Sequence, residues 1–425
     1  MKKWHIYTPD GVSDILFGDC TRKRSLEADL RGVFRLAGYR ELETPTLEFY
    51  DVFGGDNALI RQEQMYKFTD AQGRLLVLKP DMTIPVARVA ATALKNPVWP
   101  LKCFYIGNTF AADELGGGRQ NEYTQAGVEL LGVNSPEADA EVIATAVRAV
   151  QATGLKDFQI DVGQVEFFRG IMEESGLLPD EIEEVRTLID RKDFVGVEEL
   201  VRCHAIPAGL EALILDLPKL FGSKDIIQRL EGQQIGRRAT AALESLRTVL
   251  DILEDRGVAD HVSVDLGMVQ SLNYYTGIVF RGYTHGVGFP ILSGGRYDNL
   301  VSRFGLECPA TGFSLGVNLV MMALTRQYRD REEADGGILV AYRPGGRKKA
   351  VAVCDAFRNE GRIAELDIAG RDGEAAGEYA RRRGHALLVM VDEAGGVRER
   401  ALAADLAEQA DGMAGRVSTA EGANA

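Results

Sequence analysis

Three short strand-like segments followed by one long amphipathic helix constrain the fold most. The segments carry runs of Leu, Val, Ile and Phe between turn signals, and they lie at residues 74–78, 103–106 and 128–133. A Ser-Pro-Glu triplet at 135–137 then supplies an N-cap, a first-turn proline and a first-turn acid, and apolar residues recur at helical spacing until Gly154. Strands followed by a helix segregated from them predict an α+β fold with an antiparallel sheet flanked by helices.

A second helix is predicted near the start of the chain. Apolar residues recur at helical spacing from residue 21 to 37, and Gly38 offers the left-handed conformation that often follows the end of a helix. The next residues, up to Pro45, are expected to be extended, because a proline disfavours the helical conformation of the residue before it.

The domain organisation follows from length and from shifts in composition. With 425 residues the chain has room for two or three domains. We assign residues 1–328 to a core with a helical insertion at about 166–260, and the charged stretch 329–337 to a linker. Residues 338–417 are expected to form a small α/β domain, and the small polar residues 418–425 a disordered tail.

Strand signals resume after the insertion, at residues 262–266 and 278–280. The core is then predicted to close with a helix whose apolar face is formed by Leu315, Leu319, Met322 and Ala323.

Composition restricts the kinds of partner. Acidic residues outnumber basic ones, 63 against 49, so the formal net charge is −14 and nucleic acid is not an expected partner. No apolar run is long enough to cross a membrane, and the start of the chain lacks the apolar core of a signal peptide, so we expect a cytoplasmic protein. Cysteines and histidines are scattered without ligand spacing, so neither disulfides nor a metal site is predicted.

Four segments of the chain resemble, in this order, the core of histidyl-tRNA synthetases. They are residues 79–83 (KPDMT), 125–129 (QAGVE), 270–277 (QSLNYYTG) and 293–298 (SGGRYD). The resemblance implies a class II aminoacyl-tRNA synthetase-like fold. The helix at 21–37 and the extended residues after it are similar to motif 1 of that class, which implies self-association through this region. The domain at 338–417 loosely resembles an anticodon-binding domain.

The resemblance also implies a pocket for histidine. The residues that hold the α-ammonium group in the family match Asp81, Thr83 and Gln125, which provide acceptors suited to a cation with three donors. The residues that contact the imidazole match Glu129, Tyr274 and Tyr275. Taken singly, a glutamate that alternates with apolar residues is also typical of the solvated face of a strand, and a pair of tyrosines is also typical of packing. Four segments in the family's order favour the pocket.

The cations that the family places around ATP have no counterparts here. Ala111 and Asn121 stand where arginines are expected in and after the segment similar to motif 2, and Leu319 replaces the arginine of motif 3. Gln270 replaces the arginine that opens the tyrosine-pair segment. Adenylate formation depends on charge stabilisation at the α-phosphate, and the loss of one such donor typically costs about two to three orders of magnitude in rate. We therefore expect no histidine activation.

This combination is similar to the regulatory subunits of ATP phosphoribosyltransferase, which are synthetase paralogues in the first step of histidine biosynthesis. The similarity is carried by residues 78–83, 123–130 and 293–300. It implies a protein without catalysis or a cofactor of its own, a hetero-oligomer with the short catalytic subunit, and histidine as a feedback effector. Because Gln270 leaves the histidine carboxylate without its cation, a subunit interface is an alternative place for histidine.

Two other functions stay open. A divergent histidyl-tRNA synthetase is disfavoured by the missing arginines. A stand-alone sensor of histidine or tRNA is not decided by any feature of the sequence, and co-purification of a partner would distinguish it.

Overall fold

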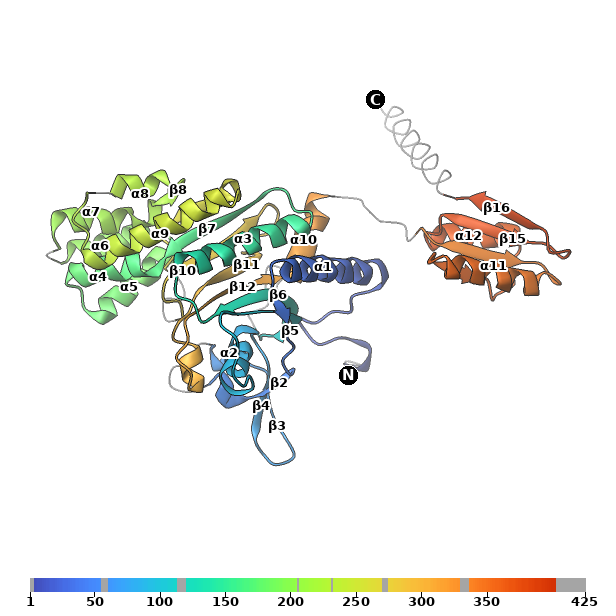
Figure 1. Ribbon diagram of the computed structural model, residues 1–425, viewed down its shortest axis with the longest axis horizontal. Coiled ribbons are helices and arrows are strands. Elements are labelled where there is room, and N and C mark those ends of the chain that lie inside the picture. Colours follow the sequence, from blue (N-terminus) through green and yellow to red (C-terminus); the bar gives the residue numbers. More distant parts are fainter. Residues whose placement is uncertain are drawn as a thin grey trace, which may run out of the picture. The chain divides into compact units, whose positions relative to one another are not determined.

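The computed structural model describes residues 4–54, 60–112, 120–204, 206–230, 232–269, 274–328 and 336–402. The chain divides into two compact units, Met1–Arg329 and Asp330–Ala425 (Figure 1), and each is described by itself. Of the expected linker at 329–337 only Gly336 and Gly337 belong to the described residues, and the expected tail at 418–425 lies outside them.

The first unit is built on a nine-stranded sheet with the order β1-β5-β6-β12-β11-β10-β7-β9-β8. Its strands are β1 (Arg40–Glu41), β5 (Leu101–Phe110), β6 (Glu122–Leu131), β7 (Phe158–Gln164), β8 (Phe221–Gly222), β9 (Val262–Asp265), β10 (Ile278–Thr284), β11 (Leu292–Arg296) and β12 (Ala310–Gly316). All neighbours from β5 to β7 in this order are antiparallel, whereas β1–β5 and β7–β9 are parallel pairs toward the two edges. A small antiparallel sheet, ordered β2-β4-β3, comprises β2 (Leu47–Phe49), β3 (Lys67–Thr69) and β4 (Leu75–Leu78).

Helices cover the large sheet on both faces. On one face, α1 (Phe17–Leu36), α3 (Pro136–Ala152) and α10 (Val317–Gln327) pack into the main core (Figure 1). On the other face lie α2 (Thr83–Thr92) and the 3-10 helix η6 (Val301–Phe304), with a second core cluster. The two-residue period of β6 divides its side chains between these faces, so that Val128 and Leu130 join the main core and Glu129 points the opposite way.

The predicted start of α3 is present in atomic detail. The Ser135 hydroxyl accepts a hydrogen bond from the Ala138 backbone N–H at 3.4 Å, Pro136 occupies the first turn, and Gly154 adopts a positive φ of 88° just after the helix.

The helical insertion lies between β7 and β9. It comprises α4 (Val165–Ser175), α5 (Pro179–Asp190), α6 (Phe194–Arg202), α7 (Ala208–Asp216), α8 (Asp225–Leu230) and α9 (Arg237–Asp255). The short strand β8, which pairs with β9, interrupts the helices.

The expected closing helix was wrong at its start. Leu315 belongs to β12, where it pairs with Ala126 of β6, and α10 begins only at Val317. Leu315 is fully buried in the sheet. It lies two residues after Phe313 on the same face of β12, whereas its spacing from the apolar residues of α10 also fits a helix.

The second unit is a small three-layer α/β domain. Its sheet has the order β14-β13-β15-β16, formed by β13 (Ile338–Tyr342), β14 (Ala364–Leu366), β15 (Leu387–Val391) and β16 (Val397–Ala401). Side chains alternate along β13 between two cores, one under α11 (Arg347–Asn359) and one under α12 (Gly373–Arg382). Among the described parts of the whole chain, no helix has the length and apolar character to cross a membrane.

Candidate functional site

Five of the six residues predicted to contact histidine line one cavity of about 110 Å³ on the α2 face of the large sheet. Gln125 comes from β6, Thr83 is the first residue of α2, and Asp81 lies two residues before it. Tyr274 and Tyr275 come from the residues before β10. The remaining lining residues are Ser293, Gly294, Tyr297, Gly312, Phe313 and Ser314.

The sixth residue, Glu129, is not among the residues that line this cavity, and it is completely buried. The Tyr105 hydroxyl donates to one carboxylate oxygen at 3.3 Å, and the Tyr297 hydroxyl donates to the other. The Thr83 and Tyr105 hydroxyls are 3.5 Å apart, which extends this network to α2. The interpretation of Glu129 as a residue on a solvated strand face is therefore wrong.

Glycines provide the space that Glu129 and the cavity occupy. Gly312 of β12 lies opposite Glu129 in the strand register, and a Cβ added there would be 1.8 Å from the Glu129 Oε2 atom. A Cβ on Gly294 would be 2.5 Å from the Gly312 carbonyl oxygen. Both glycines line the cavity, so bare backbone forms part of its floor.

Burial dominates the electrostatics of the cavity. It raises the pKa of Asp81 to about 6, even though the Ile84 backbone N–H donates to that carboxylate at 2.8 Å. Burial also raises the pKa of Glu129 to about 8, against the opposing effect of its tyrosine and threonine hydrogen bonds. No lysine, arginine or histidine is among the described residues that line the cavity. A cationic group placed there would favour the ionised form of Asp81.

Gln125 leaves an acceptor for such a group. Its side-chain Oε1 atom is buried and has no hydrogen-bond partner within the described structure. A buried amide oxygen without a partner carries a desolvation cost of about 1–3 kcal/mol, which a ligand donor would remove. Together with Asp81 and Thr83, it offers acceptors for an ammonium group.

The two tyrosines form an aromatic wall. Their rings are 4.8 Å apart in an edge-to-face arrangement, and the ring of Tyr274 also lies 5.5 Å from that of Tyr297. The Tyr275 carbonyl accepts a hydrogen bond at 3.3 Å from Arg169 of α4, which connects this wall to the helical insertion.

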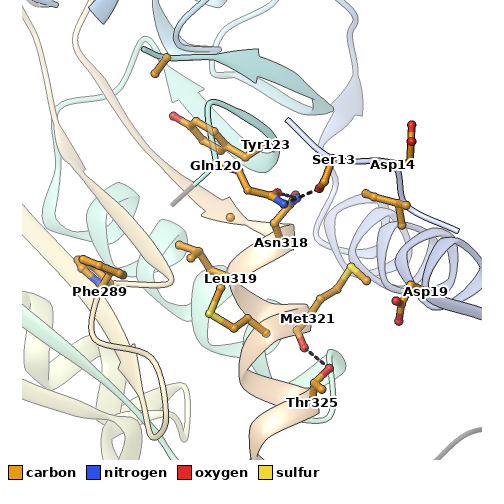
Figure 2. A pocket seen from close by; sticks show the side chains of 15 residues that line it. Ser13, Asp14, Asp19, Gln120, Tyr123, Phe289, Asn318, Leu319, Met321 and Thr325 are labelled. Atoms are coloured by element: carbon orange, nitrogen blue, oxygen red, sulfur yellow. Dashed lines mark hydrogen bonds between the residues drawn. The ribbon is translucent and has the colours of Figure 1, made fainter. Parts of the chain in front are cut away.

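Ala111 and Leu319 lie at a second, larger cavity of about 570 Å³ (Figure 2). This cavity adjoins the first. Tyr123 lines the larger cavity, and Gln125, two residues further along the same face of β6, lines the smaller one. Its described lining contains no lysine, arginine or histidine.

The other two positions without the family's arginines differ from these. Asn121 is buried and holds the start of the chain, because its backbone N–H donates to the Gly11 carbonyl at 2.7 Å and its side chain donates to the Asp10 carbonyl at 3.3 Å. Gln270 lies outside the described residues.

Sequence reasoning missed Tyr105, Tyr297 and Gly312. Tyr297 stood within the segment 293–298, but its partner became visible only when β11 and β6 were placed on either side of β12. Tyr105 is on β5 opposite Gly127 of β6, a strand pairing that the sequence does not state.

Comparison with known proteins defines first the class of protein. Residues 11–320 match the family model described as histidyl-tRNA synthetase. The structure of histidyl-tRNA synthetase from Nostoc sp. PCC 7120 superposes with a TM-score of 0.80 at 22% identity, covering 95% of this chain and 98% of that one. The first unit with its nine-stranded sheet therefore has the class II aminoacyl-tRNA synthetase-like fold.

Closer relatives define the particular family. A protein of Acetivibrio thermocellus named ATP phosphoribosyltransferase regulatory subunit is 59% identical over 394 residues, which are 92% of this chain and 94% of that protein. A Bacillus halodurans structure described as an ATP phosphoribosyltransferase regulatory subunit/histidyl-tRNA synthetase has a TM-score of 0.80 at 30% identity, covering 92% and 98% of the two chains. The chain belongs to the family of ATP phosphoribosyltransferase regulatory subunits.

Proposed function

We propose that this chain is the non-catalytic regulatory subunit of an ATP phosphoribosyltransferase in the cytoplasm. In this role it is required for the activity of the short catalytic subunit in the first step of histidine biosynthesis, and it transmits feedback by histidine. The observation that carries the proposal is the contrast between two neighbouring cavities. The one predicted to take histidine keeps Asp81 and its tyrosines, and the one beside it carries Ala111 and Leu319 in place of arginines.

Histidine is the effector that the smaller cavity fits. Its α-ammonium group would meet Asp81, Thr83 and the unpartnered Gln125 oxygen, and its imidazole would lie against Tyr274 and Tyr275 above Glu129. A bound ammonium group compensates the desolvation of Asp81, since an opposite charge nearby favours the carboxylate. Feedback further requires histidine to bind one state of the assembly better than another, typically by about 1–3 kcal/mol.

Self-association belongs to the same proposal. The region similar to motif 1 leads directly into the small sheet, and Leu47, Phe49 and Phe68 are 47%, 45% and 38% exposed there. The strand register places Phe49 and Phe68 on either side of Leu76, so their side chains share one apolar face. We assign this face to contact with a second copy of the chain.

The test combines this chain with the short catalytic subunit of its source organism. We expect the catalytic subunit to be nearly inactive alone, to gain phosphoribosyltransferase activity on mixing, and to co-elute with this chain as one large species. Histidine should inhibit the mixture, and Asp81→Asn should weaken that inhibition while activation persists. The matched control is Asp70→Asn, which changes an acid in the turn between β3 and β4, away from the cavity.

Separate elution with unchanged turnover would overturn the proposal. Histidine-dependent exchange between ATP and pyrophosphate at the rate of a synthetase would instead favour a divergent histidyl-tRNA synthetase.

A further inference from the structure

The lining of the candidate histidine pocket suits the ammonium group of an amino acid better than its carboxylate. Asp81, Thr83 and Gln125 present acceptors, and none of the described lining residues is a lysine, an arginine or a histidine. A carboxylate only accepts hydrogen bonds, and its strongest partners are cationic donors. A cation within reach of this cavity would therefore complete a site for a whole amino acid.

Ser293 and Ser314 mark the side of the cavity that can take a carboxylate. They line it from β11 and β12, and they are directly opposite each other in the strand register. Within the described part of the chain, neither hydroxyl has a hydrogen-bond partner. Ser293 is also exposed, so water and solutes reach this side of the cavity.

Arg281 of β10 continues the row that these two serines begin. It is opposite Ser293 in the register of β10 and β11, and residues opposite each other in an antiparallel pair project from the same face of the sheet. Neighbouring strands are only about 5 Å apart, so a side chain as long as that of arginine can extend over Ser293 toward the cavity. The electrostatics agree with this placement. Burial raises the pKa of Tyr275, which lines the cavity, and the positive charge of Arg281 opposes that rise.

No described residue engages the Arg281 guanidinium. The side chain is partly buried, and it forms neither a hydrogen bond nor an ion pair with any residue that the structure describes. Asp161 of β7 is its neighbour on the side away from Ser293, but that carboxylate already accepts a hydrogen bond from the Ser263 hydroxyl. A partly buried cation without a partner carries a desolvation cost, which an anionic ligand would offset.

We propose that Arg281 binds the carboxylate of histidine, with the Ser293 and Ser314 hydroxyls as further donors. This assignment rests on the proposed function, which makes histidine the effector of the cavity. The ammonium group lies at Asp81, and the carboxylate lies at the row that ends in Arg281. The position of Gln270 then does not have to supply a cation, and the cavity selects a complete amino acid over a molecule without a carboxylate.

Calorimetry with histidine and histidinol tests the proposal, because histidinol keeps the imidazole and the ammonium group and has an alcohol in place of the carboxylate. The full chain is measured alone and in complex with the short catalytic subunit. We expect histidine to bind at least tenfold more tightly than histidinol. Arg281→Gln should weaken histidine binding at least tenfold and change histidinol binding less than twofold. Arg281→Lys should keep part of the preference, because it retains the charge without the planar fork.

Asp161→Asn is the matched control, since it changes the neighbour of Arg281 on the side away from the cavity. It should keep or increase the affinity for histidine, because it removes a negative charge that attracts Arg281. If Arg281 and Asp161 only stabilise the sheet as a pair, the Arg281→Gln and Asp161→Asn chains should instead lose both ligands alike. Unchanged histidinol binding shows that the cavity is intact in each variant.

The proposal is overturned if Arg281→Gln binds histidine as tightly as the unsubstituted chain, or if it loses histidine and histidinol to the same extent. It is also overturned if Asp161→Asn loses as much histidine affinity as Arg281→Gln. In these cases the unsubstituted chain still binds histidine and activates the catalytic subunit, so the proposed function stands. If the unsubstituted chain binds no histidine, alone or in the complex, histidine is not the effector and both proposals fail.

Discussion

At the scale of single residues, Glu129 is a buried acid whose neutral form is favoured. Its folded-state pKa of about 8 lies above the ordinary value of 4.5, and burial is the main cause. A group with a raised folded-state pKa contributes its full stability below the unfolded pKa and loses it as pH rises toward the folded one. Glu129 therefore makes the fold progressively less stable between about pH 4.5 and pH 8.

Glu129→Gln should remove this pH dependence. Glutamine resembles the protonated acid, so we expect similar free energies of unfolding for the two chains near pH 5. At pH 9 the variant should be more stable by a few kcal/mol, since each pKa unit corresponds to about 1.4 kcal/mol. Urea unfolding at both pH values measures the difference. A constant difference across this range would show that Glu129 is ionised in the folded chain at all of these pH values.

Gly312→Ala tests whether bare backbone beside Glu129 is required. The added methyl carbon would be 1.8 Å from the Glu129 Oε2 atom and 2.6 Å from the Val128 carbonyl oxygen, so the carboxylate or the strand must move. We expect a loss of about 1–3 kcal/mol in unfolding free energy and weaker histidine binding. Gly32→Ala in α1, where no atom lies within 4 Å of the added carbon, should be neutral or stabilising. Equal effects at the two sites would contradict the packing argument.

The identities of the candidate pocket residues were predictable, but their partners were not. Asp81, Thr83, Gln125 and the tyrosine pair were found because their segments keep the order known from synthetases. Tyr105 and Asn121 acquire their roles through strand pairing and through contact with the start of the chain, which local sequence patterns do not encode.

At the scale of elements, the helical insertion holds the aromatic wall of the candidate pocket. Arg169 of α4 donates to the Tyr275 carbonyl and pairs with Glu166, which also accepts from Arg238 of α9 at 2.6 Å. These contacts connect the insertion directly to the wall of the candidate pocket, and under the proposed function they offer a route by which histidine binding would reach a partner.

Arg169→Ala should therefore weaken histidine binding about five- to tenfold, because a half-buried charged hydrogen bond to the wall is lost. Arg186→Ala is the matched control, since Arg186 pairs with Glu183 at the same spacing on α5 of the same insertion and does not line the cavity. Calorimetry with histidine compares the two variants. Equal affinities would show that Tyr275 holds its position without α4.

Elements were easiest to predict where local chemistry marks their ends. The N-cap, proline and glycine of α3 are all present as expected, because capping involves only neighbouring residues. The boundary at Leu315 failed because Gly316 alone separates the buried strand from the helix, and the apolar residues on either side of it fit one helical pattern. The parallel pairs β1–β5 and β7–β9 also depend on partners distant in the sequence.

At the scale of the whole molecule, the apolar face of the small sheet is the surface that we propose joins two copies of the chain. Phe49 and Phe68 lie on this face with Leu47, all of them more than a third exposed, and such a patch is typical of an interface. Phe49→Glu combined with Phe68→Glu should bury charges at the contact between two copies and shift the chain toward the monomer. Sedimentation analysis at micromolar concentration measures this shift.

Leu75→Glu is the control, because Leu75 is 41% exposed on the same sheet but pairs with Thr69 on the opposite face, and it should leave the oligomeric state unchanged. If the double variant stays associated, the interface between the copies lies on another surface. If it dissociates but still activates the catalytic subunit, activation does not depend on self-association. If both properties are lost together while histidine affinity is kept, the copies must pair before the catalytic subunit can bind.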